Sequence, residues 1–529
     1  MAVKIIHFAY FLIVLFSNDS VEAVIGVTWG RQSAQRLVPS QVVDLLLQNG
    51  IREARIYNAN VDVLQAFAGS GIGLTISIFD TKDMRSLDAA QKWVLDKIVP
   101  YPNTNISRAV PEDMNNSLLL LTTFVAQLQV NNSPMEKLGL RCQSIAMRIY
   151  YGNPYGWARL ENTYGRLGLS SVLDSMMFVH NALYDFGYGD KIKLTIPQPY
   201  TILKNITRPS EAEFRDDIKE DIGRYLRYLK DNDSPFTLDE PSISYLYENN
   251  YDLSFAFCDN KSTHVITDIN GFVYTNMFEF MHDSFVWAIK KAGVPNLKIV
   301  IGLVGWPTDG HPEANILNAE RFYKSLLPLV TSNKGTPMRP GAPIDVYLHT
   351  LTDENRLFLF DSFSRHFGIY RGNGEPKFKI DFSGQGRDIF PTKARGIVRM
   401  PKRWCVYNGE KENNKEIVMQ EFQYACNATD CTKLAPGGSC SHLDFARNIS
   451  YAFNMYFQFK FQDENACDFK GLGKVVTTNP SIGSCIFNVD VVQGVQKQMS
   501  RPITNGCKLH EMPKCAILLF LLSTFLALL

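Results

Sequence analysis

The sequence predicts an α/β protein, built as a (β/α)8 barrel followed by a small disulfide-rich domain. Short β-branched runs alternate with longer segments whose apolar residues recur every three or four positions, over about 360 residues. Eight strands that alternate with helices over this length match the order of a (β/α)8 barrel. Six of the ten cysteines then fall close together near the C-terminal end. A doubly wound open sheet has the same periodicity and is the alternative for the first domain.

The predicted strands are short apolar runs, at residues 24–30, 53–59, 73–79, 144–152, 191–197, 236–241, 298–306 and 344–352. The predicted helices have the three-to-four spacing, at residues 39–49, 89–98, 170–186, 214–229, 277–292 and 314–327. The strands of a barrel end at one face, and that face carries the chemistry. We therefore expect site residues at these ends, namely Trp29, Tyr57, Asn153, Trp306 and Glu354.

The first 23 residues have the features of a secretory signal peptide. Lys4 precedes an apolar run at residues 5–16, and the segment closes on the small residue Ala23. Cleavage after Ala23 would deliver the protein to an oxidising compartment outside the cytosol.

The other end of the sequence predicts a lipid anchor. Residues 515–529 are apolar but shorter than the roughly 20 residues that a spanning helix needs. A polar spacer and a group of small residues beginning at Asn505 precede them. This order is typical of a GPI signal, with Asn505 as the anchor site and residues 506–529 as the removed propeptide. A retained membrane helix is the alternative.

In a secreted chain, clustered cysteines predict disulfides rather than a metal site. The cluster consists of Cys405, Cys426, Cys431, Cys440, Cys467 and Cys485, and spacing alone does not choose among its possible pairings. The domain boundaries that follow are 24–382 for the barrel, 383–403 for a linker, 404–487 for the small domain and 488–505 for a tail. Glycosylation sequons begin at Asn105, Asn115, Asn131, Asn205, Asn232, Asn260, Asn427 and Asn448.

The net charge of +1 argues against nucleic acid as a partner, because no strongly basic segment is present. The nine histidines show no metal-ligand spacing, so we expect no metal and no cofactor. We expect a monomer.

Several segments resemble, in order, those of plant β-1,3-glucanases of glycoside hydrolase family 17. They are residues 25–30 (IGVTWG), 55–59 (RIYNA), 305–310 (GWPTDG), 334–341 (KGTPMRPG) and 365–370 (RHFGIY). The cysteine-rich region resembles the X8 domain, also called carbohydrate-binding module family 43, at residues 404–405 (WC), 426–431 (CNATDC), 450–454 (SYAFN) and 480–485 (PSIGSC).

The resemblance implies a TIM barrel that hydrolyses β-1,3-glucan with retention, using two glutamates. It places the acid in a Gly-Asn-Glu at the end of the fourth strand and the nucleophile just before Gly-Trp-Pro at the end of the seventh. Here Pro154 stands at the acid position and Leu303 at the nucleophile position. Neither side chain can do the chemistry, so we expect hydrolysis to be lost. Of the acidic site positions, only Glu354 is kept.

A second alignment matches residues 109–114 (AVPEDM) to the end of the fourth strand and offers Asp113 as the acid. The polar residues 103–108 do not have a strand pattern, so we instead expect residues 103–143 to be an insertion or retained intron sequence.

The resemblance also implies the pairs Cys405–Cys467, Cys426–Cys431 and Cys440–Cys485. It implies a β-1,3-glucan (callose) binder on the outer face of the plasma membrane and in the cell wall. The alternative function is an active endo-1,3-β-glucanase that has recruited another carboxylate, from Asp239, Glu240, Glu354 or Glu161. In the X8 domain, the spacing of Tyr451, Phe453 and Tyr456 predicts the buried face of a helix.

Overall fold

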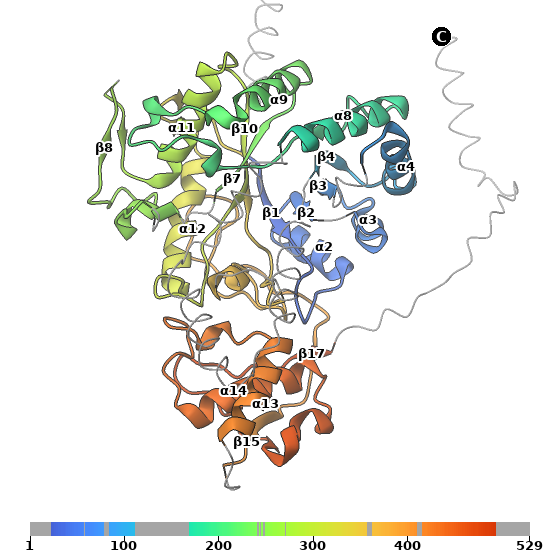
Figure 1. Cartoon of the computed structure of the whole chain (residues 1–529), viewed down its shortest axis with the longest axis vertical. Coiled ribbons are helices and arrows are strands. Elements are labelled where there is room, and N and C mark those ends of the chain that lie inside the picture. The colour runs from blue at the N-terminus through green and yellow to red at the C-terminus, as the bar shows by residue number, and fades with distance from the viewer. Residues whose placement is uncertain are drawn as a thin grey trace, which may run out of the picture. The chain divides into compact units, whose positions relative to one another are not determined.

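The computed structural model describes residues 23–492, except 58, 79–83, 112–168, 241–242, 244, 247–248, 270, 357–361 and 410–414. Its centre is a parallel sheet in the order β5-β4-β3-β2-β1-β13-β10-β7-β6 (Figure 1). These strands are β1 (Ile25–Trp29), β2 (Glu53–Ile56), β3 (Gly73–Ile78), β4 (Ile106–Pro111), β5 (Lys193–Leu194), β6 (Gln198–Pro199), β7 (Phe236–Glu240), β10 (Ile299–Val304) and β13 (Val346–Leu348).

The two edge strands of this sheet belong to one segment of chain, so the sheet closes on itself. Thr195 lies between β5 and β6. Its amide donates to the carbonyl of Ala109 in β4 at 3.3 Å, and its Oγ1 is hydrogen-bonded to Oγ1 of Thr237 in β7 at 2.9 Å. The predicted (β/α)8 barrel is therefore confirmed, with β5 and β6 as two parts of its fifth strand, and the open-sheet alternative is wrong.

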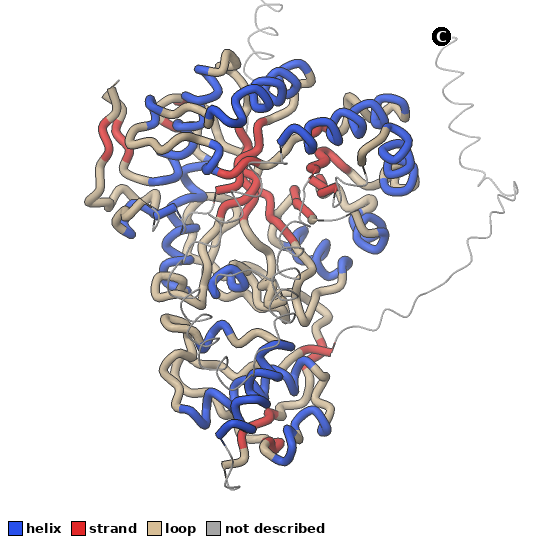
Figure 2. Tube along the Cα trace, viewed as in Figure 1, coloured by secondary structure: helices blue, strands red, loops and turns tan. Residues whose placement is uncertain are grey.

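Helices pack outside the strands (Figure 2). They are α2 (Pro39–Gln48), α3 (Val61–Phe67), α4 (Leu87–Lys97), α8 (Leu169–Asp185), α9 (Lys219–Asp231), α11 (Met277–Lys291) and α12 (Ile316–Thr331). The sequence predicted all of these except α3. α9 begins later than predicted, because Asp216–Ile218 forms a 3-10 turn before it. Two short hairpins, β8 (Ile266–Thr267) with β9 (Val273–Tyr274) and β11 (Gly335–Thr336) with β12 (Arg339–Pro340), complete the barrel domain.

The fourth strand is not where the sequence predicted it. β4 pairs with β3 from Ile106 to Pro111 and with β5 at Arg108 and Ala109, in the place expected for residues 144–152. The prediction of an insertion over 103–143 is thus wrong for residues 106–111. The polar residues of this segment made the strand hard to recognise in the sequence. In the structure Arg108 donates a hydrogen bond to the hydroxyl of Tyr347 at 2.9 Å. The predicted run 144–152, with Asn153 and Pro154 after it, lies outside the described residues.

The small domain has its own core around two helices and a short hairpin. β15 (Trp404–Tyr407) pairs with β16 (Gly473–Val476), and α13 (Lys415–Ala428) packs against α14 (Phe445–Phe459). Tyr451, Phe453 and Tyr456 on α14 are buried, as predicted. The three disulfide pairs are confirmed as Cys405–Cys467, Cys426–Cys431 and Cys440–Cys485.

Residues 383–403, predicted as a linker, lie against the barrel. Thr392 exchanges hydrogen bonds with the side chain of Asn49 at 2.8 and 3.2 Å, and the Gln41 amide donates to the carbonyls of residues 395 and 396. β14 (Val398–Arg399) then pairs with β17 (Val491–Val492), the start of the predicted tail. No helix within the described ranges is long and apolar enough to cross a membrane.

Candidate functional site

The carboxyl-terminal ends of the strands bring together part of the predicted site, but its two tryptophans lie in the core. Trp306 is 0% exposed and Trp29 is 3% exposed. The indole of Trp306 donates to the Glu313 carbonyl at 2.9 Å, and the rings of Phe257 and Phe322 each lie 5.5 Å from its ring. With their surfaces covered in this way, Trp29 and Trp306 have no open face on which a sugar could stack.

Tyr57, at the end of β2, is half-buried and belongs to a polar cluster inside the mouth of the barrel. The His349 Nδ1 lies 3.4 Å from the Tyr57 hydroxyl and 3.0 Å from the Thr28 hydroxyl. Burial lowers the pKa of His349 to about 3, and the charge of Arg55 lowers it further in the same direction. The imidazole is therefore neutral at physiological pH and available only as a hydrogen-bonding group.

An ion pair lies beside this cluster. Arg55 is buried and donates to both oxygens of Asp239, at 2.7 and 3.2 Å, and to the carbonyl of Gly302 at 2.9 Å. Asp239 in β7 is in register with Leu303 in β10, the residue at the predicted nucleophile position. The carboxylate nearest to that position along the sheet is thus bound by an arginine.

Arg55 and His349 were missed as site residues by the sequence reasoning. Both lie in predicted strands, at positions where a polar side chain interrupts an apolar run. In a barrel, such interruptions point to the interior, and this was the signal that could have found them.

Glu354 follows β13 and is 4% exposed. Its Oε1 accepts a hydrogen bond from the Gln32 amide at 3.1 Å. A Cβ at Gly30 would lie only 1.8 Å from that same oxygen, so any larger residue there would displace the Glu354 carboxylate. Burial raises the pKa of Glu354 to about 7, and the charge of Asp353 adds to the rise while the Gln32 hydrogen bond opposes it.

The neighbouring carboxylate, Asp353, is paired as well. Its Oδ1 lies 2.5 Å from the Lys377 Nζ and accepts from the Gly368 amide at 2.9 Å. Burial lowers the pKa of Lys377 to about 8 although Asp353 opposes this shift. A retaining glycosidase needs two carboxyl groups about 5 to 5.5 Å apart, one protonated and one free to attack. Asp239, Asp353 and Glu354 are each held by protein groups instead.

The chain is similar to known proteins over most of its length. Residues 160–382 match the family described as glycosyl hydrolases family 17, and residues 403–474 match the X8 domain. Glucan endo-1,3-beta-glucosidase 8 of Arabidopsis thaliana is 34% identical over 475 residues, which cover 88% of this chain and 89% of that relative. Glucan endo-1,3-beta-glucosidase 5 of the same plant is 31% identical over 493 residues, covering 91% and 92% of the two chains.

Among solved structures, CJP38, a beta-1,3-glucanase and allergen of Cryptomeria japonica pollen, superposes with a TM-score of 0.55 at 27% identity. The match covers 68% of this chain and 98% of that one. The fold, the family matches and the similarity to these relatives together show that the chain belongs to glycosyl hydrolases family 17. It carries an X8 domain after its barrel.

Proposed function

We propose that this protein binds β-1,3-glucan at the cell surface without hydrolysing it. The proposal rests on Leu303, an alkyl side chain at the end of β10, where the resemblance places the family nucleophile. A leucine cannot form a covalent glycosyl-enzyme intermediate, and losing that nucleophile closes the retaining route.

The acid position has two candidates. Pro154 and Asp113 both lie outside the described residues. The register of β4 favours Asp113, because that residue follows Pro111 by two positions in the sequence. Loss of a general acid typically lowers the rate by about 10² to 10⁴. The absence of the nucleophile is therefore the stronger part of the proposal, since it applies to either alignment.

The barrel mouth supports binding of a hydroxyl-rich ligand. The Tyr57 hydroxyl is half-buried, and beside it stand the neutral imidazole of His349 and the Arg55–Asp239 pair. Such donors and acceptors, fixed by their neighbours, suit the hydroxyl groups of a sugar. β-1,3-Glucan is the ligand that the names of the relatives indicate.

A second candidate is an active endo-1,3-β-glucanase that has recruited a different carboxylate. One observation favours it, which is the pKa of Glu354 near 7 at the end of a barrel strand. A carboxyl group with that pKa can hold a proton at neutral pH, as a general acid must.

One experiment separates the two candidates. Purified chain 24–505 is titrated with laminarin, and heat of binding and release of reducing ends are both measured. We expect binding, with no reducing sugar above a buffer blank. Turnover that Glu354→Gln abolishes would establish the second candidate, and absence of both binding and turnover would refute the two together.

The proposed location is the outer face of the plasma membrane, through a GPI anchor at Asn505. Residues 1–22 and 493–529, which carry the predicted signals, lie outside the described residues. The glycoprotein proposal is supported by the exposure of the sequon residues Asn105, Asn205, Asn260 and Asn427.

A further inference from the structure

We propose that the X8 domain is docked on the barrel as a fixed part of the molecule, and that two of its three disulfides shape the two loops that make the contact. The contact is independent of the glucan-binding proposal. It involves the barrel loops that follow β10 and β13.

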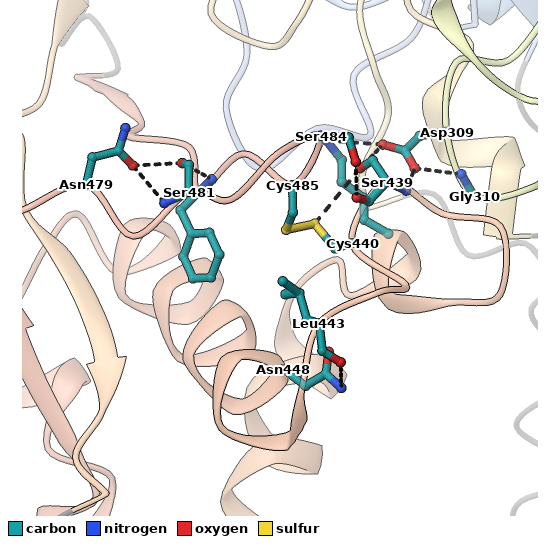
Figure 3. The surroundings of a disulfide bond; sticks show 12 residues. Asp309, Gly310, Ser439, Cys440, Leu443, Asn448, Asn479, Ser481, Ser484 and Cys485 are labelled. Carbon is teal, nitrogen blue, oxygen red and sulfur yellow. Dashed lines mark hydrogen bonds and ion pairs between the residues drawn. A yellow bond between two sulfur atoms is a disulfide. The ribbon is translucent and has the colours of Figure 1, made fainter.

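The first contact is formed by Asp309, in the loop after β10 (Figure 3). Its Oδ1 accepts from the backbone amide of Ser439 at 2.7 Å, and its Oδ2 accepts from the Ser439 hydroxyl at 2.6 Å. The amide of Gly310, in the same barrel loop, donates to Oδ1 at 2.8 Å. Lys433 places its Nζ 3.6 Å from Oδ2. A buried aspartate thus receives two hydrogen bonds and a cation from the X8 domain.

The second contact involves the segment after β13. Arg365 donates to Oδ1 of the buried Asp430 at 3.1 Å. The Nε2 of His366, which is also buried, lies 2.8 Å from the Thr432 hydroxyl. Removing the X8 domain would take these hydrogen bonds from Arg365 and His366, and a buried polar group that loses a partner costs free energy.

The backbones also approach closely. Gly437 has φ +81°, and a Cβ placed on it would lie 2.3 Å from Cδ of Pro312 in the barrel. Only glycine fits this position, both for its backbone conformation and for its distance from the barrel. The backbones of residues 437 and 312 therefore lie in direct contact.

Each docking loop contains a half-cystine next to the residues that touch the barrel. Cys440 follows Ser439 and is bonded to Cys485, and the Ser484 hydroxyl donates to the Ser439 carbonyl at 2.8 Å (Figure 3). Cys431 lies between Asp430 and Thr432 and is bonded to Cys426. Each docking loop is therefore constrained by a disulfide that lies within the X8 domain.

The third disulfide provides a control. Cys405 in β15 is bonded to Cys467, and both are buried in the X8 domain, as Cys440 and Cys485 are. Neither is next to a residue of the two contacts. All three bonds lie within the X8 domain, so none of the disulfides between described residues joins it to the barrel.

The test measures amide hydrogen exchange by mass spectrometry on the full chain 24–505. It compares the unaltered protein with Cys426→Ala/Cys431→Ala, with Cys440→Ala/Cys485→Ala and with Asp309→Ala. Peptides covering 307–312 and 362–368 report docking, and peptides covering α14 report the fold of the X8 domain.

We expect each of these variants to exchange at least tenfold faster at the barrel loops, while α14 stays protected. Cys405→Ala/Cys467→Ala should instead expose α14. Arg447→Ala, which breaks only an exposed ion pair with Asp444, should change neither region. Unchanged barrel loops in Asp309→Ala would overturn the docking. Barrel loops that lose protection only together with α14 would overturn the role given to the two disulfides.

Discussion

Asp239 and Leu303 lie in register on neighbouring strands of the barrel, and both carboxylate oxygens of Asp239 accept hydrogen bonds from the buried Arg55. The acidic group beside the predicted nucleophile position is thus part of an internal ion pair. If Asp239 were recruited as a nucleophile, Arg55 would have to release it. This relationship leads to the first two predictions below.

The first prediction concerns restored hydrolysis. Leu303→Glu combined with Asp113→Glu should release reducing sugar from laminarin, whereas either substitution alone should stay near background. A retaining mechanism needs both carboxyl groups, so their effects should not simply multiply.

The matched control is Leu303→Glu with Pro154→Glu, which should stay inactive, because the fourth strand ends at Pro111 and not at residue 152. Activity in this control pair alone would show that the acid position had been correctly placed at Pro154 by the first alignment.

The second prediction concerns stability. Asp239→Ala removes one carboxylate partner of the buried Arg55 guanidinium, which keeps its hydrogen bond to the Gly302 carbonyl. Breaking a buried pair costs about 3 to 5 kcal/mol, and the partial exposure of Asp239 places the expected loss at or below the lower end of that range. Urea unfolding followed by fluorescence measures it. Lys92→Ala, which removes an exposed pair with Asp96, should cost about 0.5 kcal/mol or less. Equal losses in the two variants would contradict the prediction.

The third prediction concerns pH. Glu354 has a folded-state pKa of about 7, above its ordinary value of 4.5, so the native state binds the proton more tightly than the unfolded state. Stability should therefore fall as pH rises from about 4.5 to 7, by at most about 3 kcal/mol from this group.

Glu354→Gln should remove the part of the pH dependence of the unfolding free energy that comes from Glu354. Urea unfolding across the same pH range measures this dependence. Burial also raises the pKa of Asp490 to about 7, so the variant should still lose stability with rising pH, but less than the unaltered protein does. A slope that is identical in the two proteins would show that Glu354 does not titrate in this way.

The fourth prediction concerns the anchor. Phosphatidylinositol-specific phospholipase C should release the protein from membranes, because a GPI anchor is cut by this enzyme and a membrane helix is not. Asn505→Trp should block display at the surface, since the anchor site accepts only small residues. Protein that stays bound while a control GPI protein is released would favour the retained helix.

The sequence by itself predicted the barrel and the X8 domain, and the three disulfide pairs came from the resemblance to the X8 domain. Regular alternation, ordered motifs and clustered cysteines are properties of the sequence itself, so they can be recognised without knowledge of any long-range contact. It also singled out Leu303 and Glu354 as predicted site positions, because each lies next to a recognisable segment, GWPTDG or the end of the predicted eighth strand.

Only the tertiary structure decided which polar residues belong inside the barrel and which aromatic residues belong to its core. The sequence of β4 contains polar residues that argue against a strand, yet Arg108 donates a hydrogen bond to the Tyr347 hydroxyl in β13. The sequence suggests that Trp306 could stack on a sugar, yet its side chain is fully buried beside Phe257 and Phe322. The pairing of Asp309 with Ser439 joins residues 130 positions apart. Burial and hydrogen bonding depend on which distant segments meet, and that information appears only when the chain has closed into its barrel.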